Sequence, residues 1–222
     1  MEIPTKKVRI KRVAQMNAIL EELYPNAQIE LIFKTDFECF VAVLLSAQCT
    51  DLRVNQVTKK LFNKYKTIHA FAIAKQLELE KDVFSCGFYR NKARNIIAAA
   101  QKVEKEFDGK LPRTLAELIT LPGAARKTAN VVLSTLYGVT EGIAVDTHVR
   151  RFALRFDLTD YKDPVRIEKD LMEIMPKSQW WSFNHRLVHY GRHCCKAHTH
   201  DCTNHPLTKI FTPANAIWPK AH

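Results

Sequence analysis

Apolar side chains recur at helical spacing along almost the whole chain, whereas the alternation of apolar and polar residues typical of strands is hard to find. The first segment shows the pattern, with one apolar face formed by Val8, Val13, Met16, Ile19, Leu20 and Leu23. The same spacing predicts further helices near residues 36–47, 52–65, 68–77, 91–107, 114–120, 126–137, 147–156, 164–175 and 179–189. The sequence therefore predicts an all-α protein with short connections.

The chain has 222 residues with 46% apolar content, which is enough for one large or two modest domains. Its longest apolar stretch, FVAVLLSA from Phe40 to Ala47, is far shorter than the roughly 20 residues that a membrane-spanning helix needs. The first residues, MEIPTKKVRIKR, contain no apolar segment, so we expect no secretory signal. These features predict a cytoplasmic protein without a membrane partner.

The charge balance favours polyanionic partners. Thirty-four lysines and arginines against 23 aspartates and glutamates give a net charge of +11. Such a surplus is typical of nucleic-acid binding, although many basic proteins bind no nucleic acid. Three of the six cysteines, Cys194, Cys195 and Cys202, cluster with histidines near the end of the chain, and a disulfide framework is not expected.

The stretch LPGAARKTANVV, residues 121–132, indicates a tight turn that runs straight into a helix. Pro122 fixes φ for a turn, and Gly123 permits a positive φ. The backbone N–H groups at such a turn and at the helix start are unpaired and suit a phosphate, to which Arg126 adds positive charge. An ordinary connection between two helices is the alternative.

Lys127 follows in the first turn of that helix, where the helix dipole and Arg126 both disfavour a positive charge. An amine there is unusually nucleophilic and could form a Schiff base with a sugar carbon, whereas a solvated surface lysine is the alternative. Downstream, IAVDTHVRRF places Asp146 at a helix start, where it is a good N-cap. If the chain folds so that Asp146 faces Lys127, the carboxylate could accept a proton or stabilise a cationic sugar.

Four motifs, in this order, resemble those of the helix-hairpin-helix DNA glycosylases and, within them, the endonuclease III family. They are LLSAQCTDLRVN (44–55), GFYRNKARNI (87–96), LPGAARKTANVV (121–132) and VDTHVRR (145–151), and the resemblance covers roughly residues 8–207. It implies a two-lobed all-α fold with a DNA-binding cleft between the lobes. A six-helix barrel with the hairpin would span 28–139, and a discontinuous second lobe would combine 1–27 with 140–222.

The resemblance also implies roles for single residues. Lys127 matches the Schiff-base nucleophile, and Asp146 matches an aspartate that assists it and stabilises positive charge on the sugar. Gln48 matches a glutamine that enters the gap left by the extruded base, and Phe88 matches a wedge beside the unpaired base, with a core aromatic as the alternative. The remaining candidates for DNA binding are Gly123, Ala125, Arg126, Thr128 and His148, of which His148 would support the site rather than perform chemistry.

By this resemblance the protein is a bifunctional DNA glycosylase and abasic-site lyase that excises oxidised pyrimidines in base excision repair through β-elimination. Lys127 favours that reaction, because related adenine and methylpurine glycosylases generally lack a lysine at this position. Two alternatives stay open: a mismatch thymine or uracil glycosylase on the same fold, and a DNA-binding protein without catalysis. The expected partner is double-stranded DNA with damaged bases or abasic sites, bound by a monomer.

The hairpin departs from the family at one position. Ala125 stands where the hairpin usually has a second glycine. A methyl group opposes a positive φ and a close approach of the DNA backbone. We therefore expect slightly weaker phosphate binding without loss of function.

A larger departure concerns the four cysteines, spaced C-x6-C-x2-C-x5-C, that hold a [4Fe-4S] cluster in many family members. Cys195 and Cys202 fill the first two positions, but His205 and Phe211 fill the others. Phenylalanine cannot ligate iron, so we predict no such cluster and no cofactor.

Two interpretations of this segment remain. The favoured one is a loop held by apolar packing, through Pro206, Leu207, Ile210, Phe211 and Trp218. The alternative is a zinc ion held within the irregularly spaced group Cys194, Cys195, His198, His200, Cys202 and His205, with Cys195, Cys202 and His205 as the ligand set.

Overall fold

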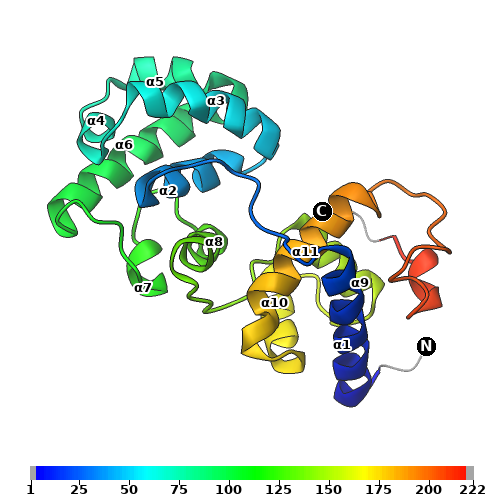
Figure 1. The fold of residues 1–222 in the computed structure, drawn as a ribbon. Coiled ribbons are helices and arrows are strands. Elements are labelled where there is room, and N and C mark those ends of the chain that lie inside the picture. The colour runs from blue at the N-terminus through cyan, green and yellow to red at the C-terminus, as the bar shows by residue number, and fades with distance from the viewer. Residues whose placement is uncertain (1–3, 219–222) are drawn as a thin grey trace. The chain divides into compact units, whose positions relative to one another are not determined.

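The computed structural model describes residues 4–218, and within them every regular element is a helix (Figure 1). The all-α prediction is therefore confirmed. In this described range, no helix is long and apolar enough to cross a membrane. The chain divides into two compact units: a continuous unit, Glu30–Glu141, and a discontinuous unit made of the described parts of Met1–Ile29 and Gly142–His222.

The continuous unit is built around α2 (Asp36–Ser46), in which every residue from Phe37 to Leu45 is buried. A helix that is apolar on nearly all sides belongs in a core, whereas its neighbours need only one apolar face. The helices that pack against α2 are α3 (Asp51–Lys64), α6 (Tyr89–Glu106) and α8 (Arg126–Tyr137). The other elements of this unit are α4 (Ile68–Ala72), α5 (Gln76–Val83), η1 (Phe84–Cys86) and α7 (Leu115–Leu118).

Threonines define where four of these helices begin. The side chains of Thr35, Thr50, Thr67 and Thr114 each accept a hydrogen bond from the backbone N–H three residues later. Each bond satisfies one of the N–H groups that a helix start leaves without a partner.

The predicted helix at 68–77 is wrong, because the chain forms two short helices there, α4 and α5. Ile73 and Leu77 are 67% and 73% exposed, so their helical spacing marks no buried face. Phe71 is buried instead, and a hydrogen bond from Ala74 N to Phe71 O turns the chain at the end of α4. The bounds of α8, in contrast, agree with the predicted 126–137.

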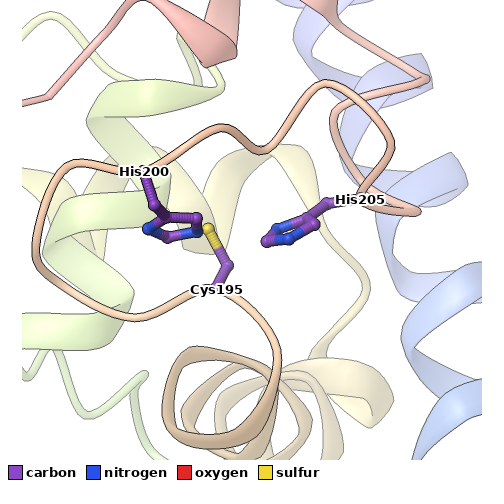
Figure 2. A group of neighbouring side chains, drawn as sticks. All are labelled: Cys195, His200 and His205. Atoms are coloured by element: carbon purple, nitrogen blue, oxygen red, sulfur yellow. The ribbon is translucent and has the colours of Figure 1, made fainter.

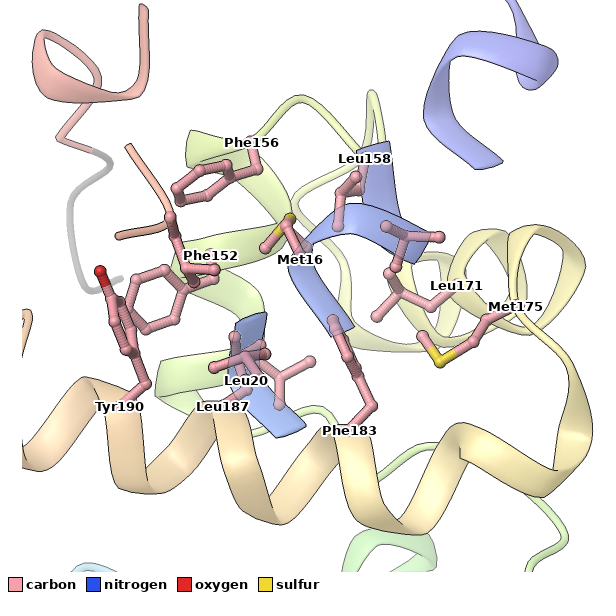
Figure 3. Close-up of a cluster of buried hydrophobic side chains, with 14 of the residues drawn as sticks. Met16, Leu20, Phe152, Phe156, Leu158, Leu171, Met175, Phe183, Leu187 and Tyr190 are labelled. Carbon is pink, nitrogen blue, oxygen red and sulfur yellow. The ribbon is translucent and has the colours of Figure 1, made fainter. Parts of the chain in front are cut away.

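In the discontinuous unit, a helix from the start of the chain packs with helices from its far end. The elements are α1 (Lys6–Leu23), α9 (Thr147–Arg155), α10 (Pro164–Ile174), η2 (Lys177–Gln179), α11 (Trp180–His193) and η3 (Thr212–Asn215). Figure 3 shows their shared core, which includes Met16, Leu20, Phe152, Phe156, Phe183, Leu187 and Tyr190. Segments far apart in the sequence therefore share one hydrophobic core.

Candidate active site and nucleic-acid interface

The hairpin before α8 contains a tight turn that requires glycine. A backbone hydrogen bond of 3.0 Å closes the turn 121–124, with Pro122 and Gly123 at its centre. Gly123 has φ +83°, which together with the preceding proline matches a type II turn. A Cβ on Gly123 would lie 2.8 Å from Leu44 Cδ1 and 3.0 Å from Asn95 Cβ. The hairpin therefore packs directly against α2 and α6.

Ala125 is the N-cap of α8 and has an ordinary extended backbone, with φ −71° and ψ 163°. The position needs no glycine, so the expected conflict with a positive φ does not arise. The start of α8 has no side-chain cap and no acidic residue in its first turn. An anion is therefore the partner that the N–H groups and the dipole of this helix start favour.

Lys127 is exposed in the first turn of α8, directly after the exposed Arg126. The half-buried Thr128 follows, and the buried Ala129 anchors the same turn in the core. One helical turn thus presents two basic side chains beside the glycine turn. Helix α8 holds them on a rigid element rather than on a loop.

Gln48 and Phe88 are both exposed and both have left-handed backbone angles, with φ +54° and +46°. Residues other than glycine adopt this region rarely, and such residues gather at functional sites. Phe88 is 64% exposed at the N-cap of α6, so it is not a core aromatic. An exposed ring on a constrained backbone is suited to insertion between stacked bases.

A buried lysine, Lys92, ties together the loop that follows α2 and the loop that precedes α6. Its Nζ donates hydrogen bonds to Leu45 O at 2.9 Å, to Ala47 O at 2.7 Å and to Cys86 O at 2.7 Å. Only 5% of the residue is exposed, and burial lowers the pKa of Lys92. Sequence patterns do not reveal this role, because a lysine near a helix start usually indicates a solvated side chain.

Asp146 caps α9 through its carboxylate, whose Oδ1 accepts a hydrogen bond from Val149 N at 2.8 Å. His148 lies against α11 so closely that a Cβ on Gly191 would collide with its ring. This packing fixes the histidine in place. Asp146 and His148 belong to the discontinuous unit, whereas the other candidate residues belong to the continuous unit.

His185 on α11 interacts electrostatically with Asp146. No motif in the sequence indicates this interaction. Burial lowers the pKa of His185 to about 4, while Asp146 opposes the shift. Its ring packs against Trp181 with the centroids 4.7 Å apart. The imidazole is therefore neutral at physiological pH.

Arg155, at the end of α9, anchors the loop that follows α11. The residue is fully buried; its Nη1 donates to Cys195 Sγ and its Nη2 to Cys202 Sγ, both at 2.9 Å. Nε and Nη2 also donate to Ala214 O, and the guanidinium lies 3.9 Å from the ring centroid of Trp218. Burial raises the pKa of Cys195, whereas Arg155 opposes that rise.

The residues of this loop do not fit a [4Fe-4S] cluster. Phe211 occupies the fourth cluster position, and its ring packs 6.4 Å from that of Phe156 and 3.8 Å from the guanidinium of Arg12. The third position is His205. The four aligned positions therefore supply two cysteines, whereas such a cluster uses four thiolates.

The structure instead groups Cys195 with His200 and His205, whose ligand atoms all lie within 4.8 Å of one another (Figure 2). The zinc set suggested by the sequence, which included Cys202, needs a correction. Cys202 is not in this group, and its Sγ donates to Asn215 Oδ1 at 3.1 Å. The sequence places His200 among the possible ligands, but irregular spacing does not select it, because it falls on none of the four cluster positions.

A family model described as HhH-GPD superfamily base excision DNA repair protein matches residues 41–177. Endonuclease III of Synechocystis sp. is 44% identical over 206 residues, which cover 93% of this chain and 94% of that protein. Endonuclease III of Bacillus subtilis is 45% identical over 190 residues, covering 85% and 86%. A solved structure of a trapped covalent intermediate of endonuclease III with DNA has a TM-score of 0.88 and 41% identity, covering 93% of this chain and 97% of that chain.

Gly123→Ala should destabilise the protein by roughly 1–3 kcal/mol, because it forces an alanine into a positive φ and against Leu44 and Asn95. The matched variant Ala125→Gly should cost only about 0.4–1 kcal/mol, since it merely loosens an ordinary extended residue. Urea unfolding of both variants measures the difference. Equal losses of stability in the two variants would contradict the positive φ at Gly123 and the extended backbone at Ala125.

Lys92→Met should lower the free energy of unfolding by about 3 kcal/mol or more, because it removes the donor from three carbonyl groups in two buried hydrogen bonds and one partly buried hydrogen bond. Lys105→Met, at an exposed position of the same helix, is the control and should stay within about 0.5 kcal/mol of the parent protein. Urea unfolding again gives the values. A Lys92 variant as stable as its control would show that the three bonds do not hold the loops.

Proposed function

The chain belongs to the HhH-GPD superfamily of base excision DNA repair proteins and, within it, to the endonuclease III family, and from this membership we propose that it is a bifunctional DNA glycosylase and abasic-site lyase acting on oxidised pyrimidines. Its partner is double-stranded DNA that carries a damaged base or an abasic site. The protein works as a monomer in the cytoplasm. The observation that carries the proposal is an exposed lysine in the first turn of α8, beside a glycine turn.

DNA binding begins at the hairpin. The N–H groups at the Gly123 turn and at the start of α8 bind a phosphate, and Arg126 adds its charge. Ala125 and Thr128 line the same contact, where the methyl group of Ala125 limits how closely the DNA backbone approaches. This use of a helix start for a phosphate follows from the dipole and from the N–H groups that have no acceptor within the helix.

Gln48 and Phe88 then hold the DNA open. The amide of Gln48 fills the space vacated by the extruded nucleotide, and the ring of Phe88 stacks beside the base left without a partner. Together they offset part of the unstacking cost, which is a few kcal/mol per base step. Both residues are supported by Lys92, whose hydrogen bonds join the loops that carry them.

Lys127 performs the covalent step. Its Nζ forms a bond to C1′ of the extruded nucleotide while the bond from C1′ to the base breaks, and the sugar ring opens to give a Schiff base. Loss of a proton from C2′ then expels the phosphate at C3′, which is the β-elimination. Hydrolysis of the imine returns the free lysine. The carboxylate of Asp146 takes the proton from the attacking amine and stabilises positive charge on the sugar, and His148 supports it.

Borohydride trapping tests the proposal, since reduction of the imine locks the protein onto DNA. The parent protein should be trapped on duplexes that contain thymine glycol or an abasic site. Lys127→Gln should lose trapping by on the order of 10³-fold or more, because no other group replaces the nucleophile. Lys110→Gln changes an exposed lysine of the same unit and should trap normally.

The substrates separate the alternatives. Trapping or base release on a mismatched thymine or on uracil, but not on thymine glycol, would show a mismatch glycosylase in place of one that acts on oxidised pyrimidines. Undiminished trapping of the Lys127 variant would exclude Lys127 as the nucleophile. Tight DNA binding without any trapping would leave a DNA-binding protein that has no lyase activity.

A further inference from the structure

Three side chains that commonly bind metals converge in the loop after α11, outside the residues used for DNA. Figure 2 shows the imidazoles of His200 and His205 on either side of the Cys195 thiol. One ligand atom from each of the three lies within 4.8 Å of the others. In a tetrahedral zinc site, with bonds of about 2.0–2.3 Å, such atoms are about 3.3–3.6 Å apart. Small rotations of the two half-buried histidines would close that difference.

The two imidazoles bury nitrogen atoms without hydrogen bonds. His200 Nε2 and His205 Nδ1 are both buried and have no hydrogen-bond partner among the described residues. Buried polar atoms in proteins nearly always have a partner, because an unpaired one carries the full cost of its desolvation. A metal ion bound to both nitrogens would supply the missing interaction.

The hydrogen bonding of His200 also prepares its ring for a metal. His200 Nδ1 lies 2.7 Å from the carbonyl oxygen of His198. A carbonyl only accepts, so Nδ1 carries the proton and Nε2 carries a lone pair. Histidines that bind metals characteristically donate their other N–H to a carbonyl or carboxylate, which fixes the tautomer and the orientation of the ring.

The sulfur of the group has a supporting partner of its own. Cys195 is 1% exposed, and the fully buried guanidinium of Arg155 donates to its Sγ at 2.9 Å. In the described structure, this guanidinium contacts sulfur atoms, a carbonyl oxygen and an aromatic ring. Metals bind the thiolate form of cysteine, and this hydrogen bond to Sγ can persist when the thiol gives up its proton to a bound ion. The Cys195 thiolate would thus lie between Arg155 and the ion.

We propose that Cys195, His200 and His205 bind one Zn²⁺ ion, with water in the fourth position. One thiolate and two imidazoles are ligands that zinc prefers in a tetrahedral site. Cys202 is left out, because its thiol is held by Arg155 and Asn215. The ion would hold residues 195–205 by bonds that link the end of α11 to two points of the following loop. This assignment does not depend on the proposed repair activity.

The test is the zinc content of the full-length protein after loading with Zn²⁺ and desalting, measured by mass spectrometry of the metal. The parent should retain one ion per chain, and His200→Gln and His205→Gln should each lose it. His198→Gln and Cys194→Ser change a neighbouring histidine and a neighbouring cysteine outside the group, so both should retain it. Cys195→Ser should also lose the ion, but the two histidine variants decide the outcome because they leave the buried core intact.

A thermal readout checks that the bound ion holds the loop. A chelator should lower the melting temperature of the parent and of the control variants, but not that of His200→Gln, because only a folded protein that binds the ion is stabilised by it. Zinc retained equally by the ligand variants and the controls would overturn the proposal. Failure of the parent to retain zinc, or the presence of iron with inorganic sulfide in its place, would overturn it as well.

Discussion

In the continuous unit, three hydrogen bonds from the buried ammonium group of Lys92 hold the two segments that carry the exposed side chains of Gln48 and Phe88. The three donors of Lys92 meet the carbonyl groups of Leu45 in α2, of Ala47 just after α2 and of Cys86 in η1, so the ammonium group is fully satisfied. Gln48 and Phe88 have left-handed backbones that cost about 1–2 kcal/mol each, and such conformations persist only where their surroundings impose them. The turn at Gly123 packs against Leu44 from the same helix, α2, so the hairpin depends on the same framework.

Helix α9 plays the corresponding part in the discontinuous unit. It begins at the cap provided by Asp146 and ends at Arg155, whose guanidinium holds two cysteines and a carbonyl of the C-terminal segment. Phe152 from the same helix enters the main core. The carboxylate of the site and the cysteine loop are therefore joined by one packed helix. A metal ion bound in the cysteine loop would therefore stabilise the surroundings of Arg155, at the end of α9, whose start is capped by Asp146.

The sequence predicts best where local chemistry decides the structure. The apolar spacing and the Pro122–Gly123 turn predict α8 with its observed bounds. The same reasoning fails at 68–77, because periodicity cannot tell that Ile73 faces solvent. It also does not reveal that the backbone at Ala125 is extended, a conformation that a methyl group does not oppose.

Long-range contacts account for the features that the sequence does not reveal. Lys92 is buried because carbonyl groups 45 and 47 residues away reach its ammonium group. His200 joins Cys195 only through the path of the loop, and no regular ligand spacing marks it. The motifs, by contrast, already point to Lys127 and Asp146, since those residues lie at helix starts that the local sequence defines.

In the proposed mechanism, the amine of Lys127 bonds to the sugar of the damaged nucleotide. Mass spectrometry of the protein digested after borohydride reduction on abasic DNA locates that bond directly. We expect a reduced sugar adduct on the peptide that contains residues 121–132, with fragment ions that place it on Lys127. An adduct on any other lysine or on the N-terminal amine would contradict it.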